Sequence, residues 1–289
     1  MTRSILPFDE KPPACLYALG PEGTFSDQAA RRLRDRFGWP GLPVLHTRTV
    51  AESIAKAESE EGASAVIAIE NSDAGTVIPA QDGLVRHPLT ILAETSLRVR
   101  FSLLARGRPE QARVVFAHPV AYDQCGDFVS ARLPLAQVTF TNSNMDSSAR
   151  LLAAPAGEPV AAIVPVEEGA ARPDLLVQSD IQNFSNNTTR FLLVRRRRDL
   201  ERYDFTRAKT SVFIAPAEDR PGLLHALLTV FNNHDLNLCR LESRPDRVTP
   251  WKYVFFVDFN NNAGSARCVQ ELQQTGHRIT VLGSYDAVE

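Results

Sequence analysis

The chain has 289 residues, of which 44% are hydrophobic and 23% charged, and its formal net charge is −2 at pH 7. This composition is typical of a globular protein with two or three domains, and the near-neutral charge argues against a nucleic-acid partner. The apolar runs are too short to span a membrane, and the N-terminus lacks the apolar core of a signal peptide.

The cysteines are scattered and show no CxxC spacing, which indicates neither a zinc site nor a redox pair. They are Cys15, Cys125, Cys239 and Cys268. We therefore expect reduced thiols, a cytoplasmic location and no metal.

The N-terminal part predicts alternating strands and helices. After a loose tail, residues 16–20 form a short apolar run that a Gly-Pro pair ends, and Thr24 or Ser26 is placed to cap the helix that follows. A capping box, Thr49-x-x-Glu52, starts a second helix, and residues 63–70 form a β-type run before "NSDAG" and a further helix. This order predicts parallel α/β architecture.

A second lobe is expected from Leu97, where apolar residues alternate as in a half-buried strand. Strands at 114–118, 138–141 and 160–164 and helices at 121–132 and 147–154 follow. The stretch "SNNTTRFLLV", residues 185–194, then leads from turn-type polar residues into a buried strand. A hydroxyl and a guanidinium at that entrance suit either a turn or a reaction.

The four arginines at 195–198 belong to a charged connector, and the isolated run indicates a solvated linker. Beyond it, strands and helices alternate in the order βαββαβ, which is typical of a ferredoxin-like domain. The expected elements are 210–215, 221–234, 236–244, 252–259, 265–274 and 278–285. Such a domain presents one sheet face, a common surface for pairing.

Several motifs carry a family resemblance. "ALGPEGTFSDQAA", "IENSDAGTV", "HPVAYDQC" and "NNTTRF" occur in that order, and "PGLLHALLTVF" and "NLCRLESRP" follow. From Leu16 to Tyr285 the chain resembles the prephenate dehydratases with a C-terminal ACT regulatory domain. The resemblance implies a two-lobed catalytic domain, similar to periplasmic binding proteins, followed by a ferredoxin-like ACT domain.

The resemblance also implies domain boundaries. We expect a tail at 1–15, a catalytic domain at 16–200, a linker at 201–208 and the ACT domain at 209–289. Lobe one should comprise about 16–95 plus 180–200, and lobe two about 96–179. Because the chain offers no room before residue 16 for a chorismate mutase domain, we expect a monofunctional enzyme.

The activity implied is the conversion of prephenate to phenylpyruvate, carbon dioxide and water, a step toward phenylalanine, without cofactor or metal. Since the product ring is aromatic, the enzyme need only help the ring hydroxyl leave while donors hold the two carboxylates. Thr189 matches the catalytic threonine of the family and is expected to donate to that hydroxyl. The alternative for Thr189 is a turn-closing hydroxyl.

Other site residues follow from the same motifs. Arg190 would favour binding of the substrate, which is a dianion. Asn71 would orient the substrate, and Glu70 would fix Asn71 or its loop. Gln124 would reach across from the second lobe. The residues expected to contact substrate are Thr24, Phe25, Ser26, Ser72 and Phe191. An ordinary helix cap at Thr24 would use the same groups as an anion site.

In the second domain, the resemblance implies that phenylalanine binds between two ACT domains, in a homodimer or homotetramer. The residues expected at this allosteric site are Gly222, Leu223, Leu224, Asn237, Leu238, Glu242, Ser243, Arg244 and Pro245. A chain that ends near residue 200 is expected to keep its activity and lose the response to phenylalanine.

The motifs depart from the family at a few positions. Ala117 stands where serine is common, and Arg100 and Phe101 lie on a strand that often carries histidines. Three alternatives therefore stay open: an arogenate dehydratase, a prephenate decarboxylase that does not aromatise its substrate, and a sensor that binds an anion without catalysis.

Overall fold

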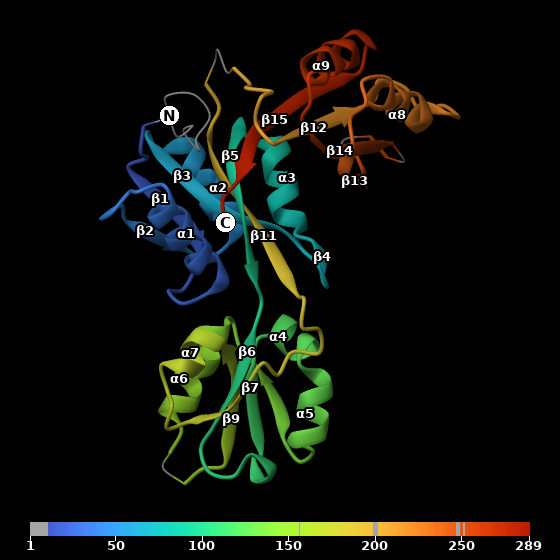
Figure 1. The fold of residues 1–289 in the computed structure, drawn as a ribbon. Helices are drawn as coiled ribbons and strands as arrows, with labels where there is room; N and C mark the ends of the chain where they lie inside the picture. The colour runs from blue at the N-terminus through green and yellow to red at the C-terminus, as the bar shows by residue number, and fades with distance from the viewer. Residues whose placement is uncertain (1–10, 156, 199–201, 247–248, 251) are drawn as a thin grey trace.

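The computed structural model describes residues 11–155, 157–198, 202–246, 249–250 and 252–289. Two lobes lie one above the other, and the C-terminal domain packs on the first lobe (Figure 1). A ten-stranded sheet runs through the first lobe and the C-terminal domain, and a five-stranded sheet forms the second lobe. The first ten residues of the expected tail, and residue 201 of the expected linker, lie outside the described residues.

The first lobe is built around a mixed sheet. Its elements are β1 (Cys15–Leu19), α1 (Phe25–Arg36), β2 (Val44–Thr47), α2 (Val50–Ser59), β3 (Ala63–Asn71), β4 (Gly75–Thr76), α3 (Ile78–Arg86), β5 (Leu89–Arg98) and the returning β11 (Thr188–Arg196). Strands β1, β2 and β3 are parallel, and β11 lies antiparallel between β3 and β5. The core cluster on one sheet face contains residues of α1, whereas the cluster on the other face contains residues of α2 and α3.

The second lobe contains β6 (Phe101–Ala105), η1 (Pro109–Gln111), β7 (Val114–Ala117), α4 (Pro119–Gln124), α5 (Gly126–Arg132), β8 (Gln137–Phe140), α6 (Asn144–Ala153), β9 (Val160–Pro165), α7 (Val166–Ala170) and β10 (Leu176–Ser179). The strand order is β10-β6-β9-β7-β8. The chain crosses between the two lobes twice, after β5 and after β10, so residues 99–100 and 180–187 form the connection.

The bounds and the burial of the strands near this crossing differ from the sequence expectation. The sequence predicts one half-buried strand from Leu97, but β5 ends at Arg98 and β6 begins at Phe101. All five residues of β6 are buried, because core clusters lie on both faces of its sheet. Strand β5 itself is buried over its first seven residues, so it lacks the alternation that identifies a half-buried strand.

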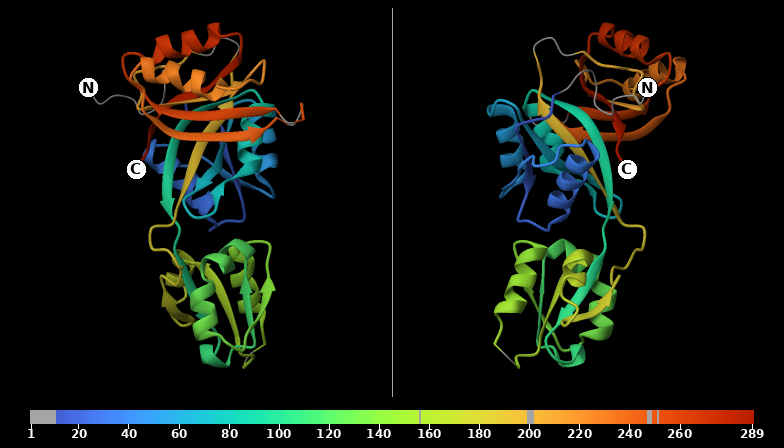
Figure 2. Two further views of the ribbon diagram at one scale, coloured as in Figure 1. Left: turned by 90° about the vertical axis from the view of Figure 1, so that its right-hand side faces the viewer. Right: turned by 60° about the vertical axis from the view of Figure 1, so that its left-hand side comes forward.

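The C-terminal domain confirms the βαββαβ order. It comprises β12 (Lys209–Ala215), α8 (Leu223–Asn233), β13 (Leu238–Pro245), β14 (Tyr253–Asn260), α9 (Ser265–Gln274) and β15 (Arg278–Ala287). Both helices cover the sheet face turned away from the first lobe (Figure 2). The other face, expected to be open for pairing, packs on the first lobe: Phe213, Phe256 and Tyr285 share a core cluster with Ile91 and Leu192.

Strand β15 joins the two domains into one sheet. It pairs in parallel with β5, where Gly283 lies opposite Ile91. A Cβ atom at Gly283 would lie 2.4 Å from the carbonyl oxygen of Ile91. Glycine therefore allows the close approach of the two strands at this point.

The arginine run does not begin as a linker. Strand β11 extends through Arg196, and the guanidinium of Arg197 donates to the carbonyl of Leu89 at 2.8 Å. The predicted solvated linker is thus wrong for Arg195 and Arg196, because strand pairing with β5 continues through them.

Every helix in the described residues is too short or too polar to cross a membrane.

Candidate functional site

Asn71 and Thr189 lie opposite each other at the end of the first-lobe sheet. Strand β11 pairs Thr189 with Asn71, Arg190 with Glu70, and then Phe191 with Ala68. Ile69 is thus an extra residue in β3, which is a β-bulge. Because the bulge shifts the alternation of side chains by one, Asn71 shares a sheet face with Thr189, and Glu70 shares the opposite face with Arg190.

The amide of Asn71 is held by five hydrogen bonds, of which the one from Nδ2 to the carbonyl of Thr188, at 3.5 Å, is the longest. Its Nδ2 donates to Thr189 Oγ1 at 2.8 Å and to Asn187 Oδ1 at 2.7 Å. Its Oδ1 accepts the backbone N–H groups of Asp73 at 3.0 Å and Ala74 at 2.7 Å. These N–H groups can only donate, so they fix which end of the amide faces Thr189.

Thr189 therefore accepts a hydrogen bond from Asn71, and its own proton is left to donate. The two residues are 9% and 8% exposed, so they retain a small opening to solvent. Ser72 supports the arrangement: its hydroxyl accepts the N–H of Thr188 at 2.9 Å, and its N–H donates to the carbonyl of Thr188. The start of β11 is thereby tied to the loop after β3.

Thr24 caps α1, and its hydroxyl is satisfied within the chain. It accepts the N–H of Asp27 at 3.4 Å and lies 2.9 Å from the carbonyl oxygens of Leu19 and Pro21. The expected substrate contact of the Thr24 side chain is not what the structure shows, since the ordinary cap uses the hydroxyl.

Asp27 fixes the loop before α1. Its carboxylate accepts the N–H of Gly23 at 3.0 Å, contacts Arg31 at 2.9 Å, and lies 2.8 Å from Nε2 of His46. Burial opposes the charge, but hydrogen bonds from Gly23, His46 and Arg31 outweigh it and hold the pKa of Asp27 below its ordinary value. The loop and the first turn of α1 are thus rigidly placed.

The first turn of α1 also contacts the second lobe. The ring of Phe25 packs edge-on against Phe101, with centroids 5.6 Å apart, and Gln28 donates to Glu167 at 3.1 Å. Ser26 is buried in the same turn. Phe101, a departure from the family pattern, therefore serves the packing between the lobes.

Gln124 ends α4, one of the helices at the end of the second lobe nearer to the first lobe (Figure 1). Gln124 is buried, and its carbonyl accepts the N–H of Asn183, a residue of the return crossing, at 2.7 Å. Gln124 thus lies on the side of the second lobe from which the sequence predicts a contact with substrate.

Arg190 and Glu70 occupy a different environment from the one expected. The Arg190 guanidinium lies 2.7 Å from Asp258, 3.3 Å from Glu94 and 3.4 Å from Glu70. It faces the ACT domain, whereas the Thr189 side chain faces the other way, because neighbouring side chains of a strand alternate. The structure therefore contradicts two expected contacts, that of Arg190 with a dianionic substrate and that of Glu70 with Asn71.

Phe191 is a core residue. It is 1% exposed and packs among residues of β1, β3 and α1. The expected contact with substrate is corrected, because the side chain is enclosed on every side. A further site residue is Asn187, which is not among the predicted residues; it is 2% exposed and binds the amide of Asn71. Its place inside the "NNTTRF" motif was the available signal.

The expected allosteric residues divide between two faces of the ACT domain. Gly222 precedes α8 with φ +80°, a conformation that favours glycine, and Leu223 and Leu224 begin the helix. Asn237 and Leu238 lie at the start of β13. Along β13, Ser243 and Pro245 are exposed, whereas Glu242 and Arg244 face the catalytic domain and contact Thr76 and Gln81.

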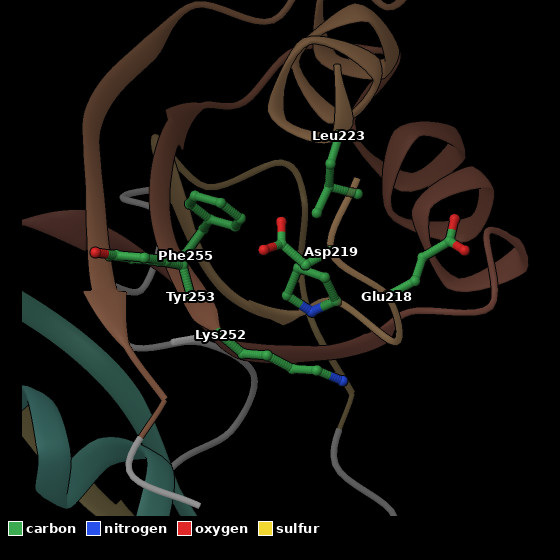
Figure 3. A pocket seen from close by; sticks show the side chains of 7 residues that line it. Glu218, Asp219, Leu223, Lys252, Tyr253 and Phe255 are labelled. Atoms are coloured by element: carbon green, nitrogen blue, oxygen red, sulfur yellow. The ribbon is translucent and has the colours of Figure 1, made fainter. Parts of the chain in front are cut away.

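A small hollow lies beside this helix start (Figure 3). Its volume is about 20 Å³, which is room for about one water molecule. The residues that line it are Pro216, Glu218, Asp219, Leu223, Lys252, Tyr253 and Phe255. Leu223 and Phe255 supply the apolar wall, and Asp219 and Lys252 supply opposite charges.

Among the described residues, no group of three or more His, Cys, Asp or Glu side chains is placed to hold a metal ion.

The fold and the Asn71–Thr189 pair define a two-lobed α/β enzyme with a C-terminal ACT domain. Residues 16–199 match the family model for prephenate dehydratase, and residues 212–277 match the model for the ACT domain. The chain belongs to the prephenate dehydratase family.

Similar proteins agree with this assignment. The prephenate dehydratase of Amycolatopsis methanolica is 32% identical over 92% of this chain and 86% of its own length. The bifunctional chorismate mutase/prephenate dehydratase of Escherichia coli K12 is 31% identical over 92% of this chain and 69% of its own length. The solved structure of the Arthrobacter aurescens prephenate dehydratase, a complex with L-Phe, has a TM-score of 0.78 and 29% identity, covering 95% of this chain and 90% of that one.

Proposed function

We propose that this enzyme converts prephenate to phenylpyruvate, carbon dioxide and water, in the biosynthesis of phenylalanine. The observation that carries the proposal is the hydrogen bond from Asn71 to Thr189, which leaves the threonine proton free at the junction of the lobes. Membership of the prephenate dehydratase family supplies the substrate and the reaction.

The reaction requires mainly that the protein position the substrate and a hydrogen-bond donor. Loss of carbon dioxide and the ring hydroxyl makes the ring aromatic, so the enzyme must stabilise the departing hydroxyl and hold the carboxylates. Thr189 donates to the departing oxygen, and the amide of Asn71 polarises the Thr189 hydroxyl by donating to its oxygen. Since a threonine hydroxyl is a weak acid, we describe Thr189 as a preorganised hydrogen-bond donor, not as a full proton donor.

The carboxylates need donors on the Thr189 side of the sheet. Because Arg190 faces the ACT domain, we propose that backbone N–H groups at the start of α1 bind one carboxylate, together with Ser26. Gln124 is proposed to bind from the second lobe. The Asp27 contacts support this assignment, since they fix the loop that leads into α1.

The product formed from prephenate distinguishes the candidate activities. The purified enzyme is incubated with prephenate, and in parallel with arogenate, and the products are identified by mass and absorbance. Phenylpyruvate with one equivalent of carbon dioxide is the expected product from prephenate. A non-aromatic keto acid would indicate the decarboxylase, phenylalanine formed faster from arogenate would indicate the arogenate enzyme, and unchanged substrates would indicate a sensor.

We also propose that phenylalanine regulates the enzyme through the ACT domain. The L-Phe complex of the Arthrobacter aurescens enzyme supports this proposal. The hollow beside Leu223 is too small for a benzyl side chain in a single chain, so we propose that a second ACT domain completes the site in a homodimer or homotetramer. The exposed edge strand β13 offers a surface for that pairing.

The regulatory site is tested by titrating the full-length enzyme with phenylalanine, by calorimetry and by activity. Ser243→Ala is expected to weaken the response while sparing kcat, because Ser243 is exposed beside Phe255 and away from Thr189. The absence of binding at millimolar phenylalanine would contradict the proposal.

A cytoplasmic location is proposed as well, and the four free cysteines support it.

A further inference from the structure

An ion network crosses from the catalytic domain into the ACT domain directly behind Thr189. Arg190 of β11 contacts Glu94 of β5 and Asp258 of β14, and the three side chains are 14%, 8% and 6% exposed. Lys209 of β12 contacts the second oxygen of Glu94 at 2.5 Å. Two positive and two negative charges thus alternate across the domain boundary, with little access to solvent.

The ACT side of this network is rigidly held. The hydroxyl of Ser211 donates to Asp258 at 2.6 Å and lies 2.6 Å from the hydroxyl of Tyr285. Tyr285 is fully buried. Burial opposes the charge of Arg190, but the carboxylates of Asp258 and Glu94 outweigh it and raise the pKa of Arg190, so the guanidinium stays charged. Removing one partner would leave an unpaired buried charge, which is costly.

Besides Glu94 and Asp258, Arg190 contacts one further carboxylate among the described residues, and that carboxylate is more exposed. The contact of Arg190 with Glu70 is longer, at 3.4 Å, and Glu70 is 39% exposed at its side chain. Its Nε atom is buried without a hydrogen-bond partner among the described residues. The position of this side chain therefore depends on Glu94 and on Asp258, and the shorter of the two contacts comes from the ACT domain.

We propose that Asp258 is a positioning residue for the dehydratase reaction, acting through Arg190 on Thr189. The two residues of β11 share one peptide group, so the anchor of the Arg190 side chain restrains the backbone that carries the Thr189 hydroxyl. A donor in an active site must be held to a fraction of an ångström. The ACT domain thus completes the support of the catalytic strand within the same chain. This inference rests on the proposed role of Thr189.

Strand β14 connects the same network to the proposed effector site. Tyr253 and Phe255 of β14 line the hollow at α8, and Asp258 lies on the opposite face of the strand, three residues further on. A ligand that shifts β14 would therefore move Asp258 relative to Arg190. A coupling of this kind alters both sites reciprocally.

The test uses Asp258→Asn in the full-length enzyme, which keeps the side-chain size and removes the charge. The matched control is Asp286→Asn, since Asp286 of the same domain also pairs with a buried arginine, Arg207, but does not contact Arg190. We expect Asp258→Asn to lower kcat by about tenfold, within the range for residues that couple sites, with a smaller change in KM. Asp286→Asn should leave kcat within about twofold of wild type, as expected for a residue outside the network.

A double-mutant cycle separates positioning from general stability. If Asp258 acts through Arg190, then Asp258→Asn should have no further effect on kcat in an Arg190→Gln background. The double variant removes one charge of each sign, so it should fold even where Arg190→Gln alone does not. In that case amide exchange in the peptide that carries Thr189 is the deciding measurement. Wild-type kcat in Asp258→Asn, or an equal loss in both backgrounds, would overturn the proposal.

Amide hydrogen exchange gives a readout that does not depend on the substrate. The peptide covering residues 185–194 should exchange faster in Asp258→Asn than in wild type and Asp286→Asn. Each protein is measured at the same interval below its own melting temperature. Unchanged exchange in that peptide would overturn the inference even if kcat fell. Altered exchange in an enzyme whose Thr189→Ala variant kept full activity would instead contradict the proposed role of Thr189.

Discussion

At the scale of single residues, the orientation of one amide decides the chemistry proposed for the site. The N–H groups of Asp73 and Ala74 occupy Oδ1 of Asn71, so its Nδ2 must point to Thr189 and Asn187. Thr189 is then an acceptor toward Asn71 and a donor toward the substrate. A hydroxyl that both accepts and donates is polarised in the direction that the reaction requires.

Replacing Asn71 by aspartate should reverse this arrangement. A carboxylate at position 71 would accept the Thr189 proton and withdraw it from the substrate, and its charge would repel a dianion. We expect Asn71→Asp to lower kcat by roughly 10²-fold or more, the scale of a positioned proton donor, and to lower it further than Asn71→Ala does. Steady-state kinetics with prephenate provides the measurement.

The control for this prediction is Asn186→Asp, which adds the same charge at an exposed position of the motif that contains Thr189. Its kcat should stay within a fewfold of wild type. Equal rates for Asn71→Asp and Asn186→Asp would remove the Asn71–Thr189 hydrogen bond from the mechanism.

At the scale of elements, helix α1 and its preceding loop are fixed by one buried carboxylate. Asp27 is 2% exposed and has a folded-state pKa below its ordinary value. A group with a lowered pKa adds stability above its unfolded-state pKa, about 3.9 for aspartate, and this stability is lost as the pH falls through the folded-state pKa.

Asp27→Asn should therefore destabilise the protein at neutral pH by about 1–3 kcal/mol, the cost of disrupting a buried charged hydrogen-bond network. The difference from wild type should be constant above about pH 5 and should shrink below about pH 4. Urea unfolding at several pH values measures it. Asp35→Asn, an exposed change in the same helix, should have little effect at any pH, and a pH-independent loss in Asp27→Asn would contradict the account.

The sequence predicted the elements better than it predicted their faces. The caps at Thr24 and Thr49 are local signals, and both helices begin where these residues indicate. The bulge at Ile69 and the pairing of β3 with β11 involve residues over 100 positions apart, so no local pattern could assign Asn71 and Arg190 to opposite faces. Strand β5 escaped prediction because its burial on both sides removes the alternation of polar and apolar residues.

At the scale of the whole molecule, the ACT domain shares a core with the first lobe. Phe256 and Leu282 pack with Ile91 and Leu192, and Asp258 pairs with Arg190. A chain that ends near residue 200 would expose this apolar surface to water and leave Arg190 without its closest partner. The sequence alone predicts that such a chain keeps its activity, whereas the shared core predicts otherwise.

We therefore expect truncation near residue 200 to lower the melting temperature and reduce kcat. Calorimetry and steady-state kinetics on the truncated and full-length chains provide the comparison. Asp258→Asn in the full-length chain serves as the reference for the ionic contribution alone. A truncated chain with the melting temperature and kcat of the full-length enzyme would show that the shared core contributes nothing to either.

The central claim is that the Thr189 hydroxyl assists departure of the ring hydroxyl, and a single-turnover experiment tests it most directly. Enzyme in excess is mixed rapidly with prephenate, and the appearance of phenylpyruvate is followed for wild type, Thr189→Ser, Thr189→Ala and the neighbouring Thr188→Ala. The account predicts a loss of roughly 10²-fold or more for Thr189→Ala, partial retention for Thr189→Ser and a near-wild-type rate for Thr188→Ala. Wild-type turnover in Thr189→Ala would contradict it.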